Sequence, residues 1–321
     1  MTSVGLVLGG GGITGFAYHT TALSILQQLT GWDPRTADVI VGTSAGANIG
    51  GLLRGGVPIG ESLDELLTVP TNPRSMERMR ELSGREQGRS LRILPTSVNL
   101  AARELLRGPF IRPGRVLSGL VPAGNIRTDS IGDRMIELHP DGWPDETFMV
   151  TAVRLSDGER VVFGRDRTDV DVGSATEASS AIPGFFRPVW IDGHRYVDGG
   201  VHSHTNADLL NDHDNLDVIV VVAPMSVNNP SDALLTANGG LRLFWRNQLA
   251  SEVKALRSLG HKVIVIEPNG DEIRAMGPTL MDPTRVVNVV LQTSSAAKVA
   301  LTAEQLGGHL DVLRTAAKHA A

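Results

Sequence analysis

Short runs of leucine and β-branched residues recur along the chain and alternate with segments of helical character. Six runs are apolar along most of their length: Val4–Leu8, Asp38–Gly42, Phe148–Val153, Arg160–Phe163, Asp217–Ala223 and Lys262–Ile266. A strand without polar alternation must be buried on both faces, as in a parallel sheet covered by helices. The pattern therefore predicts an α/β fold with a mostly parallel central sheet and helices on both sides.

Three segments between and after these runs have a helical pattern. They cover Thr14–Leu29, Ala45–Leu53 and roughly Ser295–Lys318, the last closing the chain. The segment Trp190–Val197 differs, because its central Asp-Gly stands between two short β-prone arms. Such a dipeptide is typical of a tight β-hairpin, and we predict one there.

Composition excludes several classes of protein. With 41% hydrophobic residues in 321, the chain can bury a sizeable core, and wholesale disorder is excluded. The absence of cysteine excludes disulfides, thiolate metal sites and cysteine nucleophiles, and the net charge of −5 argues against a general nucleic-acid binder. The longest apolar run, around Val218 to Met225, is far shorter than the roughly 20 residues of a membrane span, and the N-terminus does not resemble a signal peptide. We therefore expect a cytoplasmic protein.

The stretch from Thr71 to Arg127 interrupts the alternation of strands and helices. It carries eleven arginines and four glutamates, a net charge of +7, with apolar residues among them. We expect an Arg-rich helical insertion within a single domain spanning residues 1–321, placed as a lid over the site. Two interpretations of its charge stay open. The basic lid docks on an anionic membrane surface, or the arginines pair with the acidic remainder of the protein and face solvent.

The segment Gly42-Thr43-Ser44-Ala45-Gly46 follows a predicted buried strand and precedes a predicted helix. This is the context of a nucleophile elbow, a turn so sharp that residues two before and two after the serine must nearly lack side chains. Gly42 and Gly46 meet that need. Ser44 would lie beside a helix N-terminus, whose dipole favours developing negative charge. GxSxG also arises by chance in glycine-rich chains, but the strand–turn–helix context favours a nucleophile.

Glycines also fill the turn between the first strand and its helix, at Gly9–Gly12 and Gly15. Their exposed amides could cradle an anion, and three interpretations compete. The turn is an oxyanion hole for acyl transfer, a dinucleotide-binding loop, or simply a tight turn. Gly10, Gly12 and Gly15 fit the G-x-G-x-x-G fingerprint, but a dinucleotide site needs an acidic residue after the second strand, where Thr43 follows instead.

Asp198-Gly199-Gly200 directly follows the predicted hairpin and could supply the base that a serine nucleophile needs. Asp-Gly-Gly alone is ordinarily only a turn. His202 and His204 lie just beyond it and allow two alternatives, a Ser–Asp–His triad or a metal site. The third interpretation, which we favour, is that both histidines are ordinary polar residues near the mouth of the site.

Four segments in this order resemble the patatin-like phospholipase family: the glycine loop (10–15), GTSAG (42–46), ASSAIPGFFRPV (178–189) and YVDGG (196–200). The resemblance is dense over residues 4–54 and 174–206. Each segment is modest alone, but their joint order and spacing are specific. The resemblance implies a three-layer α/β/α fold and a lipid acyl hydrolase that uses a Ser–Asp dyad without histidine.

The same resemblance assigns roles to residues of this chain. Ser44 would be the nucleophile and Asp198 the base, and the amides of Gly10, Gly11 and Gly12 would form the oxyanion hole. The mechanism requires no metal and no organic cofactor. The segment 178–189 would line one wall of the site.

One position departs from the family pattern. Thr14 stands where the glycine loop usually carries arginine or lysine. The resemblance therefore does not carry over headgroup preference or the level of activity, while it leaves the dyad intact.

We therefore predict a serine hydrolase that cleaves fatty-acyl carboxylic esters of glycerophospholipids or lysophospholipids. Three alternatives remain: a catalytically silent lipid-binding or regulatory protein on the same scaffold, an acyltransferase, and a nucleotide-dependent oxidoreductase that uses the glycine loop.

Overall fold

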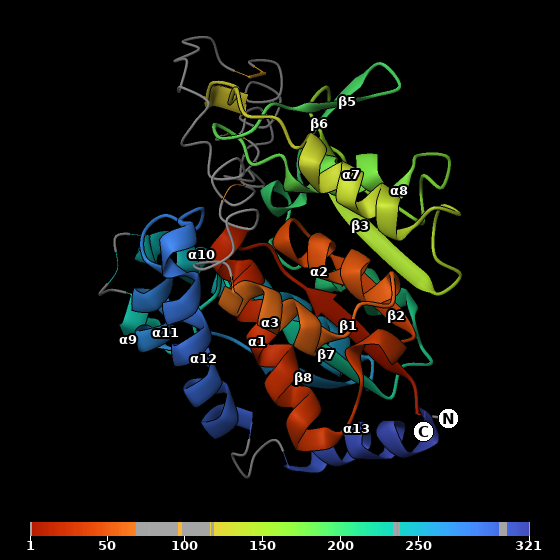
Figure 1. Ribbon diagram of the computed structural model, residues 1–321, viewed down its shortest axis with the longest axis vertical. Coiled ribbons are helices and arrows are strands. Elements are labelled where there is room, and N and C mark those ends of the chain that lie inside the picture. Colours follow the sequence, from red (N-terminus) through yellow and green to blue (C-terminus); the bar gives the residue numbers. More distant parts are fainter. Residues whose placement is uncertain are drawn as a thin grey trace.

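The computed structural model describes residues 2–68, 77, 96–97, 116, 119–233, 236, 238–301 and 307–320. The strands are β1 (Val4–Leu8), β2 (Val39–Gly42), β3 (Thr147–Arg154), β4 (Arg160–Phe163), β5 (Val189–Ile191), β6 (His194–Asp198), β7 (Val218–Val222) and β8 (Lys262–Ile266). The helices are α1 (Gly12–Thr30), α2 (Ala45–Arg54), α3 (Ile59–Thr68), α7 (Asp129–Leu138), α8 (Val172–Ser180), α9 (Pro230–Ala233), α10 (Gly239–Ser258), α11 (Gly270–Met276), α12 (Val286–Leu301) and α13 (Gly307–Ala320). Figure 1 shows how these helices surround one central sheet.

The sheet of the described residues has the strand order β5-β6-β3-β2-β1-β7-β8, with β4 paired to β3. The five strands β3, β2, β1, β7 and β8 run parallel to one another. The remaining strands, β4, β5 and β6, add to it in antiparallel pairs. The predicted mostly parallel sheet is confirmed.

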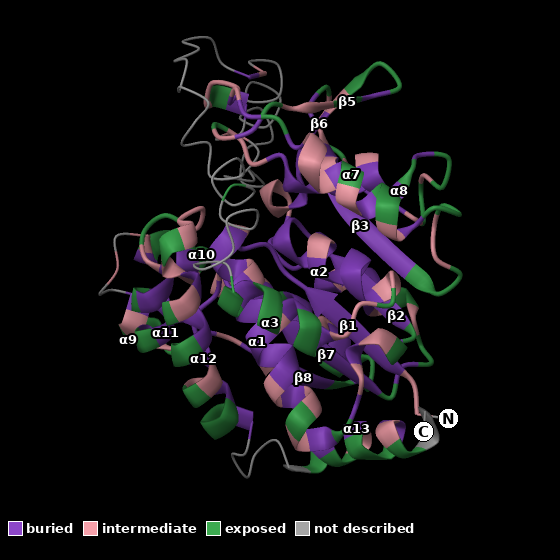
Figure 2. Cartoon of the chain, in the orientation of Figure 1, coloured by how far each residue is buried: buried purple, intermediate pink, exposed green. Residues whose placement is uncertain are grey.

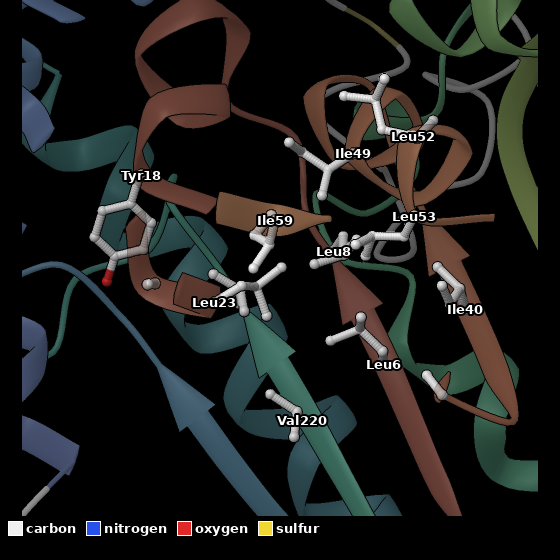
Figure 3. Close-up of a cluster of buried hydrophobic side chains, with 14 of the residues drawn as sticks. Leu6, Leu8, Tyr18, Leu23, Ile40, Ile49, Leu52, Leu53, Ile59 and Val220 are labelled. Atoms are coloured by element: carbon white, nitrogen blue, oxygen red, sulfur yellow. The ribbon is translucent and has the colours of Figure 1, made fainter. Parts of the chain in front are cut away.

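Both faces of the parallel strands are covered, which explains why the strands are apolar throughout. On one face, Leu6 and Ile40 pack with buried side chains of α1, α2 and α3 (Figure 3). On the other face, their neighbours Val7 and Val41 share a cluster with residues of α10, including Leu249. Successive strand residues point to opposite faces, so a strand that alternated apolar and polar residues would have left one face of the sheet polar. The predicted three-layer α/β/α architecture is confirmed, and Figure 2 shows its inner layer as buried.

The predicted hairpin is the pair β5–β6, closed by Asp192 and Gly193. Both turn residues have positive φ, 47° and 78°. Two positive φ values in a two-residue loop match the twist of the flanking strands, and aspartate followed by glycine is the pair that tolerates them best. The Asp-Gly dipeptide therefore predicted this turn correctly.

The prediction of one closing helix over Ser295–Lys318 is wrong. Helix α12 begins nine residues earlier, at Val286, and ends at Leu301, while α13 is a separate helix that begins at Gly307. Residues 302–306 lie outside the described residues. The apolar periodicity continues through both helices because each packs onto the same core, so periodicity alone did not reveal the division.

Strands β2 and β6 occupy successive stretches of the same edge of β3. Gly42, at the end of β2, lies opposite Val150, and Asp198, at the end of β6, lies opposite Ala152. Strand β4 fills the other edge. Because β2 runs parallel to β3 and β6 runs antiparallel to it, their carboxyl ends meet head to head at the level of Thr151. This arrangement brings the two predicted catalytic segments together.

Most of the predicted Arg-rich insertion, residues 71–127, lies outside the described residues, so its expected lid role stays a prediction. Its last residues are described, and Ile126 forms a parallel bridge with Phe186 just before β5. No helix in the described part of the chain combines the length and apolar character needed to cross a membrane.

Candidate active site

Ser44 occupies the turn between β2 and α2, as the sequence predicts. Its backbone has φ 55° and ψ −120°, and it is one of three non-glycine residues with positive φ in the described chain. A Cβ at position 42 would lie 2.5 Å from the Cα of Ala47, and one at Gly46 would collide with the carbonyl oxygen of Leu8. Both glycines are therefore required by close backbone approach, and the turn has the strain typical of a nucleophile elbow.

Asp198 ends β6 and faces Ser44. The Ser44 side chain acts on this carboxyl as a hydrogen-bonding group that lowers its pKa, and the Gly200 amide donates to Oδ1 at 2.7 Å. Burial raises the pKa of Asp198 from its ordinary 3.8 to about 6, whereas these two hydrogen bonds act in the opposite direction. A carboxylate with this pKa is ionised at neutral pH and is a stronger base than an exposed aspartate.

The glycines after Asp198 shape this turn. A Cβ on Gly199 would collide with the backbone and hydroxyl of Thr151. Glycine at that position lets the chain turn directly over β3, and the next amide, that of Gly200, then points back to the carboxylate.

The last residues of α8 and Ala181, which follows the helix, hold both halves of the pair. Ser179 Oγ accepts the Ser44 amide at 2.8 Å, and the carbonyl of Ala181 accepts the Asp198 amide at 3.0 Å. Ser180 Oγ accepts from Asn48, which also donates to the Ser44 carbonyl. The segment 178–189 was expected only to line a wall. Its serine hydroxyls, in a run of small residues, were the signal that it could also form hydrogen bonds with neighbouring backbone groups.

The glycine loop lies against Ser44, since a Cβ on Gly10 would be 3.5 Å from that of Ser44. The amide of Gly10 is already engaged, because it donates to the carbonyl of His204 at 2.8 Å. Among the described residues, the amides of Gly11 and Gly12 have no such partner. Of the three amides predicted for the oxyanion hole, two are therefore free, and Gly10 instead anchors the loop.

The start of α1 fixes the rest of this loop. Gly12 has φ +58°, and the Gly15 amide donates to the carbonyl of Gly11 at 2.8 Å. Thr14, at the position that is usually basic, is fully buried and its amide donates to the carbonyl of Leu280 at 3.0 Å. The amino ends of α1 and α2 both lie at this edge of the sheet, because Leu8 and Gly42 are paired. Their dipoles favour negative charge there.

The histidines do not join the Ser–Asp pair. Within the described chain, the groups that perturb the carboxyl pKa of Asp198 are Ser44 and the Gly200 amide. The His204 ring is fully buried near Trp245, and burial lowers its pKa to about 3, so the ring is neutral. His202 accepts a hydrogen bond at its carbonyl from Gln248. These contacts favour a two-residue arrangement over a triad.

A third histidine, His19, was not predicted and contacts the glycine loop. Its Nε2 lies 2.6 Å from the carbonyl oxygen of Gly9, and burial lowers the pKa of the ring to about 4. The neutral ring therefore donates from Nε2. In the described part of the chain, no group of three or more histidine, aspartate or glutamate side chains is arranged to hold a metal ion.

Among solved structures, the chain is similar to the type III effector ExoU, with 18% identity over 98% of this chain and 53% of that one and a TM-score of 0.39. It is also similar to VipD from Legionella pneumophila, with 14% identity over 93% and 67% of the two chains and a TM-score of 0.41. The chain thus spans about half the length of ExoU. No curated protein sequence matches it significantly.

A family model described as patatin-like phospholipase matches residues 6–211. The match contains the glycine loop, the elbow at Ser44 and the turn at Asp198. It covers more than half of the chain, and it confirms the resemblance seen in the sequence. The chain therefore belongs to the patatin-like phospholipase family.

Proposed function

We propose that the protein is a serine lipid acyl hydrolase in which Ser44 is the nucleophile and Asp198 the base. One observation carries the proposal: a strained serine at a helix N-terminus faces a buried carboxylate, whose pKa it lowers, at the meeting point of two strand ends. Membership of the patatin-like phospholipase family supports a lipid ester as the substrate class.

In the first step, the Ser44 oxygen attacks the ester carbonyl while its proton moves to Asp198. A pKa of about 6 leaves the Asp198 carboxylate about ten times more ionised than protonated at pH 7. The carbonyl oxygen becomes an oxyanion. The amides of Gly11 and Gly12, at the amino end of α1, are the donors available to stabilise it.

In the second step, the tetrahedral intermediate collapses and the protonated Asp198 returns the proton to the leaving alcohol. An acyl ester on Ser44 remains. Water, deprotonated by Asp198, then attacks this ester and releases the fatty acid. Because Asp198 alternates between base and acid, a pKa near neutrality serves both half-reactions.

We also propose that the Arg-rich stretch 71–127 contacts an anionic lipid surface. Its net charge of +7 contrasts with the overall net charge of −5. Each basic residue near such a surface is worth roughly 1 kcal/mol. Sedimentation with vesicles should show tighter binding to phosphatidylserine-containing vesicles than to phosphatidylcholine vesicles. Equal binding to the two would contradict the contact.

Hydrolysis of p-nitrophenyl acyl esters and of glycerophospholipids tests the proposed activity. Wild type should release fatty acid, and Ser44→Ala and Asp198→Asn should not. Product analysis in the presence of an alcohol acceptor separates hydrolysis from acyl transfer. If the wild type binds acyl chains but never releases product, the protein is the silent lipid-binding scaffold instead.

A further inference from the structure

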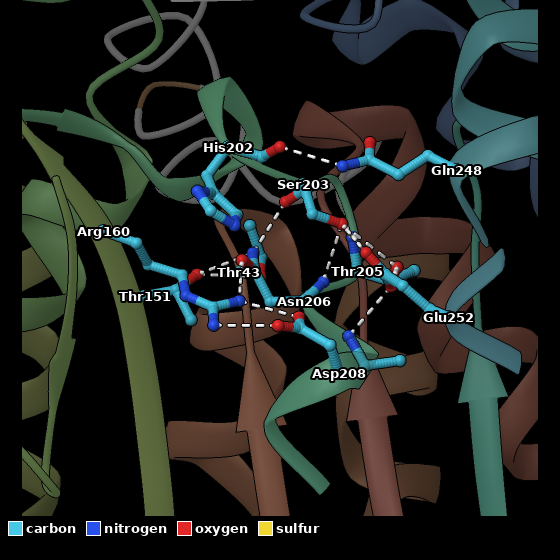
Figure 4. A network of polar contacts seen from close by, with 11 residues as sticks. Thr43, Thr151, Arg160, His202, Ser203, Thr205, Asn206, Asp208, Gln248 and Glu252 are labelled. Carbon is cyan, nitrogen blue, oxygen red and sulfur yellow. Dashed lines mark hydrogen bonds and ion pairs between the residues drawn. The ribbon is translucent and has the colours of Figure 1, made fainter. Parts of the chain in front are cut away.

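A buried polar segment, residues 203–207, contacts both the elbow and the glycine loop. Figure 4 shows Ser203, Thr205 and Asn206 of this segment among their polar partners. The segment follows the catalytic turn at Asp198 and is formed by Ser203, His204, Thr205, Asn206 and Ala207, all buried. Buried backbone outside helices and strands needs partners for its amides and carbonyls. The partners found here are parts of the candidate active site.

The first partner is the carboxylate of Glu252 on α10. It accepts hydrogen bonds from Ser203 Oγ at 2.6 Å, from Thr205 Oγ1 at 2.6 Å and from the Ala207 amide at 3.0 Å. These bonds fix the residues on either side of His204. The carbonyl of His204 is thereby held where it accepts the Gly10 amide. Glu252 thus secures the anchor of the glycine loop.

The second partner is the elbow, reached through the side chain of Asn206. Its Nδ2 lies 3.0 Å from Thr43 Oγ1 and 3.2 Å from Thr151 Oγ1, and these two hydroxyls lie 2.9 Å apart. Thr43 directly precedes Ser44 in the chain. Thr151 is the β3 residue at the level where the ends of β2 and β6 meet. Asn206 therefore bonds to the residue that follows β2 and to β3, the strand with which the ends of β2 and β6 both pair.

Asn206 has an unusual backbone that suits this task. It has φ 53° and ψ 34°, a left-handed conformation that asparagine tolerates better than most residues. The same Nδ2 donates to the Ser203 carbonyl at 2.6 Å, and Oδ1 accepts from Arg160 at 3.1 Å. Every polar atom of the amide is satisfied, so the side chain is fixed in one orientation.

We propose that Asn206 is a positioning residue that holds the nucleophile elbow and the oxyanion loop in register. Apolar side chains of similar volume would fill this region without burying polar groups, which are costly when unpaired. A fully satisfied network instead specifies one geometry. Here it joins Thr43 through the Asn206 side chain and Gly10 through the adjoining His204 carbonyl. The inference rests on the proposed function, because its consequence is measured as catalysis.

The Thr43 hydroxyl provides the sharpest test. Thr43→Val keeps the shape and removes the hydroxyl, whereas Thr43→Ser keeps the hydroxyl. Thr21→Val is the matched control, because Thr21 is equally buried and, among the described residues, its hydroxyl bonds only to the Ala17 carbonyl within α1. Asn206→Asp removes the Nδ2 donors with no change of shape and tests the centre of the network directly.

We expect kcat for a p-nitrophenyl ester to fall roughly ten- to a hundredfold in Thr43→Val and Asn206→Asp, because small displacements of reacting groups cost rates of this order. KM should change less than about threefold, and the rate of fluorophosphonate labelling should fall in parallel with kcat. Thr43→Ser should restore kcat to near wild type. Thr21→Val should lower the urea unfolding midpoint about as much as Thr43→Val does, and leave kcat unchanged.

Two results would overturn the inference, and they differ from each other. Wild-type kcat in Thr43→Val, with labelling of the wild type intact, refutes the positioning role alone. Absence of both labelling and hydrolysis in the wild type refutes the proposed function, and this inference with it.

Discussion

Replacing Asp198 by asparagine should abolish ester hydrolysis and, above about pH 6, make the protein more stable. Asparagine has nearly the same shape as aspartate. Its Oδ1 can still accept the Gly200 amide, and its Nδ2 can donate to the Ser44 hydroxyl. The substitution therefore removes a buried charge without leaving a polar atom unpaired.

The size of the gain follows from the pKa of Asp198. Burial raises this pKa from 3.8 to about 6, so the fold prefers the neutral carboxyl. A raised pKa contributes stability that is complete below about pH 3.8 and is lost as the pH rises through about 6. A shift of this size corresponds to about 3 kcal/mol, since one pKa unit is worth about 1.4 kcal/mol. The Asp198→Asn variant does not lose that contribution.

Urea unfolding of wild type and Asp198→Asn at pH 4, 5, 6 and 8 measures this difference. The other buried titratable groups, such as Glu272 and His19, are common to both proteins and cancel in the comparison. The variant should be nearly as stable as wild type at pH 4 and more stable by up to about 3 kcal/mol at pH 8. A stability difference that does not change with pH would refute the reasoning, because Asp198 would then have an ordinary pKa.

Three further predictions concern the pair and its turn. The value of kcat/KM should fall below about pH 6 with unit slope, since Asp198 must be ionised to act as the base, and an acid limb near pH 4 would contradict this. Ser44→Gly should remove activity but raise the unfolding midpoint, because glycine relieves a strain of about 1–3 kcal/mol at φ 55°. Gly46→Ala should destabilise the protein by about 3 kcal/mol or more through its collision with Leu8, whereas Gly60→Ala, with no atom within 4 Å, should be neutral or stabilising in the same unfolding assay.

The sequence predicted those parts of the fold that depend on nearby residues. The six strands were predicted correctly because burial on both faces leaves a continuous apolar run in the sequence. The Asp192-Gly193 turn was predicted correctly because its positive φ values restrict the residue types that can form it. The position of the sharp turn at Ser44 could be predicted for the same reason, because a Cβ at Gly42 or Gly46 would collide with nearby backbone.

Contacts between distant parts of the chain could not be predicted in this way. The Gly10 amide was expected to serve the oxyanion, but the His204 carbonyl accepts it, and the packing of segment 203–207 on Glu252 helps to hold that carbonyl there. Likewise, Ser179 Oγ meets the Ser44 amide because α8 packs beside α2. Such hydrogen bonds leave no periodic signal in the sequence.

The most direct measurement is mass-spectrometric mapping of the residue that a fluorophosphonate probe modifies. Labelled protein is digested, and the modified peptide is sequenced in parallel with Ser44→Ala and Asp198→Asn. We predict one adduct, on Ser44, which is lost in Ser44→Ala and strongly slowed in Asp198→Asn. An adduct on another residue, or ester hydrolysis that survives in Ser44→Ala, would contradict the assignment of the Ser44–Asp198 pair.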